Sequence, residues 1–585
     1  MKSIYIYRKI VLLSVMILTT LMTSCTDFLT IIPPDKIVHE QFWQTKEDVN
    51  GMLATSYLKL ASTDAVSRAI VWGELRADNL TFEASKTKDD IRYIVEANIT
   101  DENSYTKWGI FYEAINYANL VIEYAPLVIP RDPDFTQGEC DIVVGEMYAM
   151  RALCHFYLLR AFRNIPMAMV PAINDSELPD YKPVHPLDAL DMIMNDLNLA
   201  ENLVRASGNY SNSASNHGRI TRNAVLAMKA DVNLWRAAFT AYYKSNGDAN
   251  PLANVDVQHY YTECIANCDA VLNNLDAQYK EDNKYKPVNP EDENDKYHLI
   301  YNVNEFITDN ESLQSKSFDQ IFIDENSRES IFELQIDQNL CSQSSGNADG
   351  NTFKGLQFMY GAGVSDVTPQ VEVPKSFMKK YEKDDLRKYS FVNYPVSGQE
   401  SDIPNKLKVA KYIAKVSPVG ESGFRAKDKV DANWIVYRQT DVMLMKAEAL
   451  VLKEQPDIKK SFDIVNTINV RSRKDTTYTE IINRLSEPKT VDEAHALVLD
   501  ERLRELSFEG KRWYDLVRKA LRENTTEKIT FVADKLTSGA ASVKNKMVSI
   551  DNLFFPINVE ELRFNEHLVQ NPAYNTDDST IGMSK

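Results

Sequence analysis

The strongest constraint on the fold is a set of apolar stripes at helical spacing. One stripe runs through Val225, Met228, Val232, Trp235 and Phe239. Another runs through Val442, Met445, Ala449 and Leu452. Because an α-helix turns once in about 3.6 residues, side chains three or four residues apart lie on one face. These faces are predicted to form a hydrophobic core rather than a cofactor site.

Further helices are predicted along most of the chain. Their ranges are 41–62, 103–125, 186–205, 256–275 and 458–471. The segment Ile142–Phe162 is apolar on almost all sides, which predicts a helix buried inside a larger body. Trp108, which precedes the apolar positions of the 103–125 helix, is predicted to be core. The last stripe, assigned to one helix, comprises Leu499, Leu503, Leu506, Trp513 and Val517.

The middle of the chain has a different character. Residues 280–296 are mostly charged and polar, five glycines lie between Gly346 and Gly363, and Ile331–Ile336 resembles a short strand. We therefore predict a mainly α fold, in which tetratricopeptide-like helical pairs support a loop-rich insertion with a few short strands. The expected parts are a helical region at 25–280, an insertion of the same domain at 281–430 and a helical region at 431–585.

The N-terminus is typical of an exported protein. Basic residues at positions 2, 8 and 9 precede the apolar run Ile10–Met22, whose 13 residues are too few to span a bilayer. Residues 1–24 are therefore predicted to be a signal peptide. The small residues before Cys25 resemble a lipobox, so Cys25 is the predicted lipidation site. An ordinary secretory signal followed by an incidental cysteine is the alternative.

Charge and motif content exclude several classes of function. The net charge of −18 argues against nucleic acid and against a basic membrane patch. No nucleophile elbow, zinc-protease motif, Walker loop or dinucleotide-binding glycine motif is present, and the eight histidines are scattered, so we expect no metal and no cofactor. Apart from Cys25 there are five cysteines, Cys140, Cys154, Cys264, Cys268 and Cys341, and this odd number excludes a complete disulfide framework. Cys264 and Cys268 lie one helical turn apart with no second cluster at zinc-finger spacing, so they are predicted to be buried free thiols.

Several longer motifs, in order along the chain, carry a family resemblance. They are Cys25–Leu29 followed by Pro33, Glu146–Arg160 leading to Asn164–Pro166, Asp500–Arg518, Phe555–Ile557, Glu560–Leu562 and Gln570–Tyr574. From Cys25 almost to the C-terminus, the chain resembles the SusD/RagB family of nutrient-uptake outer-membrane lipoproteins from Bacteroidetes. Arg163 and Ala573 stand where that family commonly has glycine.

The resemblance implies a binding protein and not an enzyme. Such proteins are lipid-anchored in the outer membrane and face the cell exterior. There they deliver captured oligosaccharides, or oligopeptides in the RagB branch, to a SusC-like TonB-dependent transporter. The carboxylates of Glu501 and Glu505 fit this expectation, because flanking arginines favour local ion pairs and ionised carboxylates over acid–base catalysis.

Candidate ligand contacts are aromatic and amide side chains in the predicted loops. Flat rings suit the apolar faces of sugars, and amides suit their hydroxyl groups. In the region after the first helix we select Trp72 and Asn79, and in the insertion Tyr301 and Tyr360. A glycan ligand, a peptide ligand, and a helical scaffold that binds only proteins remain as three hypotheses.

Overall fold

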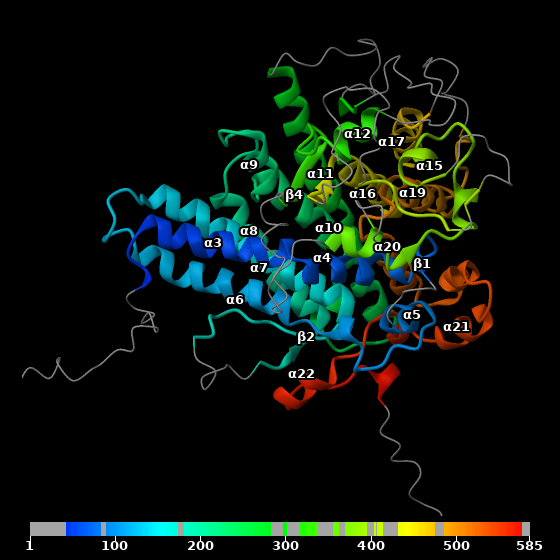
Figure 1. The fold of residues 1–585 in the computed structure, drawn as a ribbon, viewed down its shortest axis with the longest axis horizontal. Coiled ribbons are helices and arrows are strands. Elements are labelled where there is room, and N and C mark those ends of the chain that lie inside the picture. Colours follow the sequence, from blue (N-terminus) through cyan, green and yellow to red (C-terminus); the bar gives the residue numbers. More distant parts are fainter. Residues whose placement is uncertain are drawn as a thin grey trace, which may run out of the picture.

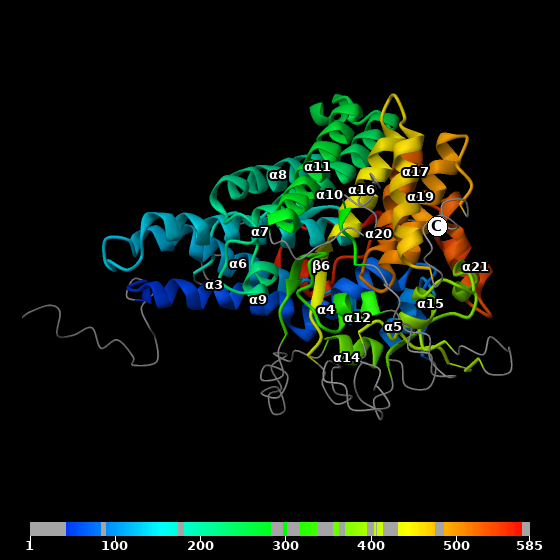
Figure 2. The ribbon, with the colours of Figure 1, turned by 90° about the horizontal axis from the view of Figure 1, so that it is seen from above.

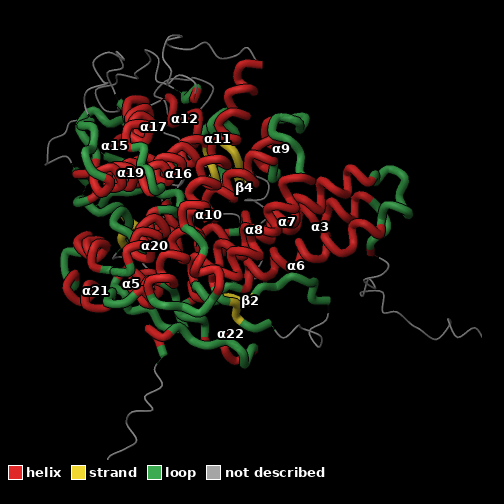
Figure 3. The backbone as a smooth tube through the Cα atoms, turned by 180° about the vertical axis from the view of Figure 1, so that it is seen from behind, coloured by secondary structure: helices red, strands yellow, loops and turns green. Residues whose placement is uncertain are grey.

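The computed structural model describes residues 42–83, 89–173, 181–281, 297–300, 316–336, 355–361, 369–394, 403–404, 406–412, 431–473 and 485–575. Helices dominate this part of the chain, and the strands are short (Figures 1 and 3). The mainly α fold predicted from the stripes is confirmed. Cys25 and Tyr301 lie outside the described residues.

The larger helices form one continuous row. In order they are α3 (Lys46–Ala61), α6 (Gly109–Tyr124), α7 (Gln137–Phe162), α8 (Pro186–Leu203), α10 (Arg222–Ser245), α11 (Val257–Glu281), α16 (Gln439–Leu452), α17 (Ile458–Arg471) and α19 (Val491–Leu506). Each packs against the next, and Figure 2 shows the row from above. This arrangement agrees with the predicted helical pairs.

Shorter elements surround the row. The helices are α4 (Thr63–Ile70), α5 (Asp89–Val95), α9 (Ser213–Gly218), α12 (Lys316–Phe322), α14 (Gly355–Tyr360), α15 (Arg387–Ser390), α20 (Arg512–Glu523), α21 (Ala540–Lys546) and α22 (Val559–Phe564). A π-helix, η2 (Val71–Leu75), continues α4. The 3-10 helices are η3 (Ser104–Thr106), η4 (Ala125–Leu127), η6 (Pro251–Asn254), η8 (Phe377–Lys380), η10 (Glu527–Lys535), η11 (Ile550–Leu553) and η12 (Pro572–Tyr574).

The core contains the side chains that the stripes selected. All five residues of the α10 stripe are at most 1% exposed, and Trp108 is 3% exposed. Of the described helices, α7 alone is long and apolar enough to cross a membrane, but 78% of its most apolar stretch is buried, as expected for a core helix. The predicted buried free thiols are confirmed at Cys264 and Cys268. Cys140 and Cys154 are free and buried as well, whereas Cys341 lies outside the described residues.

Three antiparallel strand pairs connect distant segments. They are β1 (Thr81–Phe82) with β5 (Val371–Glu372), β2 (Ile165–Pro166) with β3 (Pro183–Val184), and β4 (Ser330–Leu334) with β6 (Trp434–Arg438). In the last pair Ser330 lies opposite Arg438 and Leu334 opposite Trp434. The strand expected near Ile331 is therefore present, and it joins the insertion to the C-terminal region.

The stripe from Leu499 to Val517 does not form the single helix that we predicted. α19 ends at Leu506 and α20 begins at Arg512. Between them Phe508 and Gly510 have φ angles of 68° and 69°, which interrupt a right-handed helix. The buried carboxylate of Glu74 accepts hydrogen bonds from the backbone N–H groups of Phe508 and Gly510, both at 2.6 Å, and so stabilises the break.

Arg163, one of the two departures from the family pattern, ends α7 in a strained conformation. Its φ and ψ angles are 67° and −68°. The Asn164 N–H donates to the carbonyl of Phe162 at 2.9 Å, which closes a tight turn around Arg163. This geometry is rare and strained for a residue with a side chain. Glycine would avoid the strain, which is consistent with the glycine that the family resemblance leads us to expect there.

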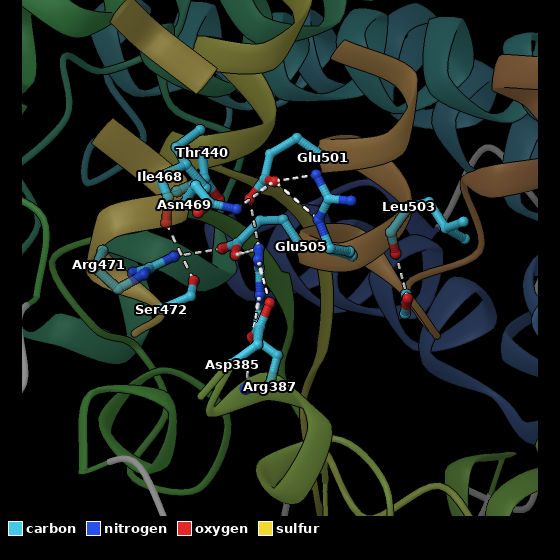
Figure 4. A network of polar contacts seen from close by, with 12 residues as sticks. Asp385, Arg387, Thr440, Ile468, Asn469, Arg471, Ser472, Glu501, Leu503 and Glu505 are labelled. Carbon is cyan, nitrogen blue, oxygen red and sulfur yellow. Dashed lines mark hydrogen bonds and ion pairs between the residues drawn. The ribbon is translucent and has the colours of Figure 1, made fainter. Parts of the chain in front are cut away.

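A buried ion-pair network attaches the insertion to the C-terminal helices (Figure 4). The Glu505 carboxylate on α19 accepts from Arg387 of α15 at 3.0 Å, from Arg438 of β6 at 2.7 Å, and from Arg471 of α17. All four side chains are fully buried. The predicted local pair is present between Arg504 and Glu501, but the partners of Glu505 come from other elements.

Candidate functional site

A polar cavity of about 720 Å³ lies where α9, the C-terminal end of α11 and the start of β4 meet. Figures 1 and 3 show these three elements side by side. The described residues that line it are Ser207, Gly208, Asn209, Ser211, Asn212, Ser213, Asn216, His217, Asn223, Leu275, Gln278, Tyr279, Glu281, Asn326, Arg328, Ser330 and Ile331. Its volume is within the range of small-molecule sites, and amide and hydroxyl groups dominate its lining.

One wall of the cavity, residues 207–218, is attached to the helical row through a buried carboxylate. Glu146 of α7 is fully buried and accepts from the Tyr210 hydroxyl at 2.7 Å and from Arg219 Nε at 3.0 Å. Its third partner is the hydroxyl of Tyr57, at 2.6 Å, and the Ile220 N–H in turn donates to this hydroxyl. Tyr210 and Arg219 flank α9, so Glu146 fixes the wall on both sides of that helix.

The wall also holds its own shape. Asn212 caps α9 by accepting from the Ser215 N–H at 2.8 Å. Asn216 pairs with the backbone N–H and carbonyl of Tyr210, at 2.8 and 3.0 Å. Gly208 has a φ angle of +84°, a conformation that favours glycine, and a Cβ there would collide with Gln278. The wall is therefore organised before any ligand arrives.

Two side chains form what we call the floor of the cavity, Asn223 at the start of α10 and Ser330 at the start of β4. Each is 2% exposed. Asn223 Oδ1 accepts from the Asn274 amide at 2.9 Å, but Asn223 Nδ2 and the Ser330 hydroxyl have no hydrogen-bond partner among the described residues. Buried polar groups nearly always have a hydrogen-bond partner. These two groups can therefore bind a ligand, or a water molecule that a ligand would displace.

The described part of the lining is close to neutral. Arg328 and Glu281 are the charged residues among the described lining residues. Burial lowers the pKa of His217, so this ring is uncharged at neutral pH. The apolar surface of the lining comes from Leu275, Ile331 and the ring of Tyr279. Such a cavity can bind a ligand that carries hydroxyl groups and an apolar face.

The selected ligand contacts do not line this cavity. Trp72 is fully buried, its indole N–H donates to the Tyr105 carbonyl at 2.8 Å, and its ring stacks on Phe111. Asn79 is fully buried against Glu74, and Tyr360 is 1% exposed with its hydroxyl on the Phe508 carbonyl. These three side chains pack in the core, away from the cavity.

These three residues were selected because segments after the first helix and in the insertion were expected to be loops. Trp72 instead lies in η2 and Tyr360 ends α14, where both contribute to the core. Their position in the core, away from the cavity, argues against contact between a ligand in this cavity and Trp72, Asn79 or Tyr360. Tyr301 remains a prediction.

The cavity was missed because its parts are far apart in sequence. One sequence signal does point to it. Residues 207–218 read Ser-Gly-Asn-Tyr-Ser-Asn-Ser-Ala-Ser-Asn-His-Gly, a dense run of small and amide residues between two helices. Loops of this composition, held by a rigid scaffold, are frequent sites of ligand binding. Its pairing with Asn223 and Ser330 depends on the fold.

The buried carboxylates of the ion-pair network are structural. Burial alone would raise the pKa of Glu501 and of Glu509. Neighbouring cations more than offset this effect, chiefly Arg387 beside Glu501 and Arg438 beside Glu509, and both pKa values lie below the usual range. Such groups are poor general acids at neutral pH. Among the described residues, no three His, Cys, Asp or Glu side chains are grouped to hold a metal ion.

The helical row and its polar cavity define a binding protein built on a helical scaffold. The chain belongs to the SusD/RagB family. A model of the SusD family matches residues 387–574, and a model described as starch-binding associating with outer membrane matches residues 27–234. This is a family of non-catalytic binding proteins associated with the outer membrane, so the prediction that the chain is not an enzyme is confirmed.

Individual relatives are distant but match nearly the whole chain. SusD-like protein P38 of Formosa agariphila is 26% identical over 511 residues, which is 85% of this chain and 88% of the relative. SusD-like protein P2 of the same organism is 22% identical and covers 88% and 91% of the two chains.

Solved structures show the same fold. A SusD homologue from Bacteroides thetaiotaomicron superposes with a TM-score of 0.66 at 18% identity, covering 91% of this chain and 98% of the other. B. fragilis NanU superposes with a TM-score of 0.62 at 18% identity, covering 93% and 100%.

Proposed function

We propose that this protein captures an oligosaccharide at the cell exterior and delivers it to a SusC-like TonB-dependent transporter. In this proposal a lipid on Cys25 holds the mature protein at the outer membrane, and regions 25–280, 281–430 and 431–585 act as one domain. The ligand occupies the polar cavity between α9, α11 and β4.

One observation carries the choice of ligand. The cavity presents amide and hydroxyl groups from residues 207–218, α10, α11 and β4, and two of its buried polar groups have no partner among the described residues. Sugar hydroxyls can donate and accept hydrogen bonds, so they can satisfy both kinds of group. The apolar side chains beside them suit the C–H faces of sugar rings. Family membership supports the transporter as the recipient of the ligand.

The test is calorimetric titration of residues 26–585, without the lipid, with a panel of oligosaccharides and polysaccharides. We expect saturable binding by at least one saccharide, weakened by Gln278→Ala. The matched control is Asn273→Ala, which removes an exposed amide on the same helix outside the cavity. Binding of oligopeptides alone would replace the glycan proposal with peptide uptake, and no binding of either would favour a scaffold.

Attachment and delivery have their own test. The full-length tagged protein should be recovered from native outer membranes together with a TonB-dependent barrel. Cys25→Ala should release the protein from the membrane fraction. Recovery without a barrel would contradict the transporter partnership, and membrane retention of Cys25→Ala would contradict the lipid anchor.

A further inference from the structure

The charge of the cavity limits which saccharides it can bind. Of the described lining residues, Arg328 supplies the one cation and Glu281 the one carboxylate. This described part of the lining therefore offers no excess of positive charge to an anionic group. The chain as a whole carries a net charge of −18, which disfavours the approach of an anion.

Arg328 is already engaged by the protein. Its Nε donates to the carbonyl of His298 at 3.1 Å, and one of its terminal nitrogens donates to the carbonyl of Leu299 at 3.0 Å. The guanidinium also lies 6.0 Å from the centroid of the Tyr279 ring. Strong recognition of a carboxylate or sulfate uses the paired N–H groups of a guanidinium, and here part of that donor set holds the backbone at residues 298 and 299.

The floor is neutral as well. Asn223 Nδ2 is a donor, and the Ser330 hydroxyl both donates and accepts. A sugar hydroxyl can accept from the first and exchange a hydrogen bond with the second. A carboxylate placed there would lose its hydration without gaining a counter-charge, which is strongly unfavourable. The nearby buried carboxylate of Glu333, which accepts from the Asn326 N–H at 3.2 Å, would add repulsion.

We propose that the cavity binds an uncharged, hydroxyl-rich saccharide through Asn223 and Ser330 and discriminates against saccharides that carry carboxylate or sulfate groups. This inference rests on the proposed glycan-binding function and narrows it to a chemical class.

The first experiment compares matched ligands. Uronate-containing oligosaccharides are titrated before and after chemical reduction of their carboxylates, and sulfated ones before and after desulfation. We expect the uncharged member of a binding pair to bind at least about 10-fold more tightly, equivalent to about 1.4 kcal/mol. Equal or tighter binding of the charged member would overturn the inference and leave glycan capture standing. No binding by any saccharide, charged or uncharged, would overturn both.

The second experiment uses Ser330→Ala. The Ser330 hydroxyl has no partner among the described residues, so its removal should leave the unfolding midpoint unchanged or slightly raised. Binding of an uncharged saccharide should nevertheless weaken about 3- to 10-fold, the usual effect of one lost hydrogen bond. Ser245→Ala, an exposed serine on α10, is the control. Unchanged affinity in Ser330→Ala would contradict the assignment of the floor.

Discussion

Glu505→Gln tests whether the buried ion-pair network stabilises the fold. The network holds five cations and five carboxylates. They are Arg387, Lys411, Arg438, Arg471 and Arg504, and Glu329, Asp385, Glu501, Glu505 and Glu509. Glutamine keeps the shape of Glu505 but removes its charge, which leaves one buried cation uncompensated. Removal of one partner from a buried pair lowers stability by about 3–5 kcal/mol.

Urea unfolding of residues 26–585 at pH 7, followed by far-ultraviolet circular dichroism, measures this loss. The control is Asp500→Asn on the same helix, whose carboxylate is 42% exposed and 3.2 Å from the 40% exposed Lys380. An exposed pair of this kind contributes about 0–1 kcal/mol. If Glu505→Gln were no more destabilising than Asp500→Asn, the network would not stabilise the fold as argued.

The same variant has a pH dependence with a definite sign. Burial raises the pKa of Glu505, but Arg471, Arg438 and Arg387 outweigh it and hold the pKa well below its usual range. A carboxylate whose pKa is lower in the folded state stabilises that state above its unfolded pKa, about 4.3 for glutamate. The stability difference between wild type and Glu505→Gln should therefore be full at neutral pH and shrink as the pH falls below about 4.3.

Three further variants test separate features. Gly73→Ala should lower the free energy of unfolding by about 1–3 kcal/mol, because a Cβ at this position of η2 would overlap the Gly510 carbonyl. A thermal unfolding midpoint equal to that of the wild type would contradict this close approach. Tyr210→Phe removes one hydrogen bond to Glu146 and should weaken saccharide binding about 2- to 10-fold. The thermal unfolding midpoint should change little. Arg163→Gly should raise the free energy of unfolding in urea by about 1 kcal/mol, because the relief of backbone strain exceeds the loss of the partly exposed ion pair with Asp551. A destabilised variant would show that the strain at Arg163 is small.

Periodicity was sufficient to predict the helical row because each stripe records the local burial of one helix. The α10 stripe and the apolar α7 segment therefore became core as expected. The break between α19 and α20 was not predictable in this way, because Glu74 stabilises it from 436 residues away along the chain. The burial of Trp72 was missed for a related reason, since its stacking partner Phe111 belongs to another helix.

The ion-pair network also constrains the order in which the chain can assemble. The helices from α3 to α11 pack against neighbours in sequence, so this half can form before the later residues are available. β4 and α15, by contrast, must wait for β6 and α19 to supply Arg438, Glu501 and Glu505. Until then Arg387 has only the neighbouring Asp385 as a counter-charge, and Glu329 lacks its partner Arg471. The insertion is therefore expected to be the last part to dock and the part most exposed to proteases and chaperones.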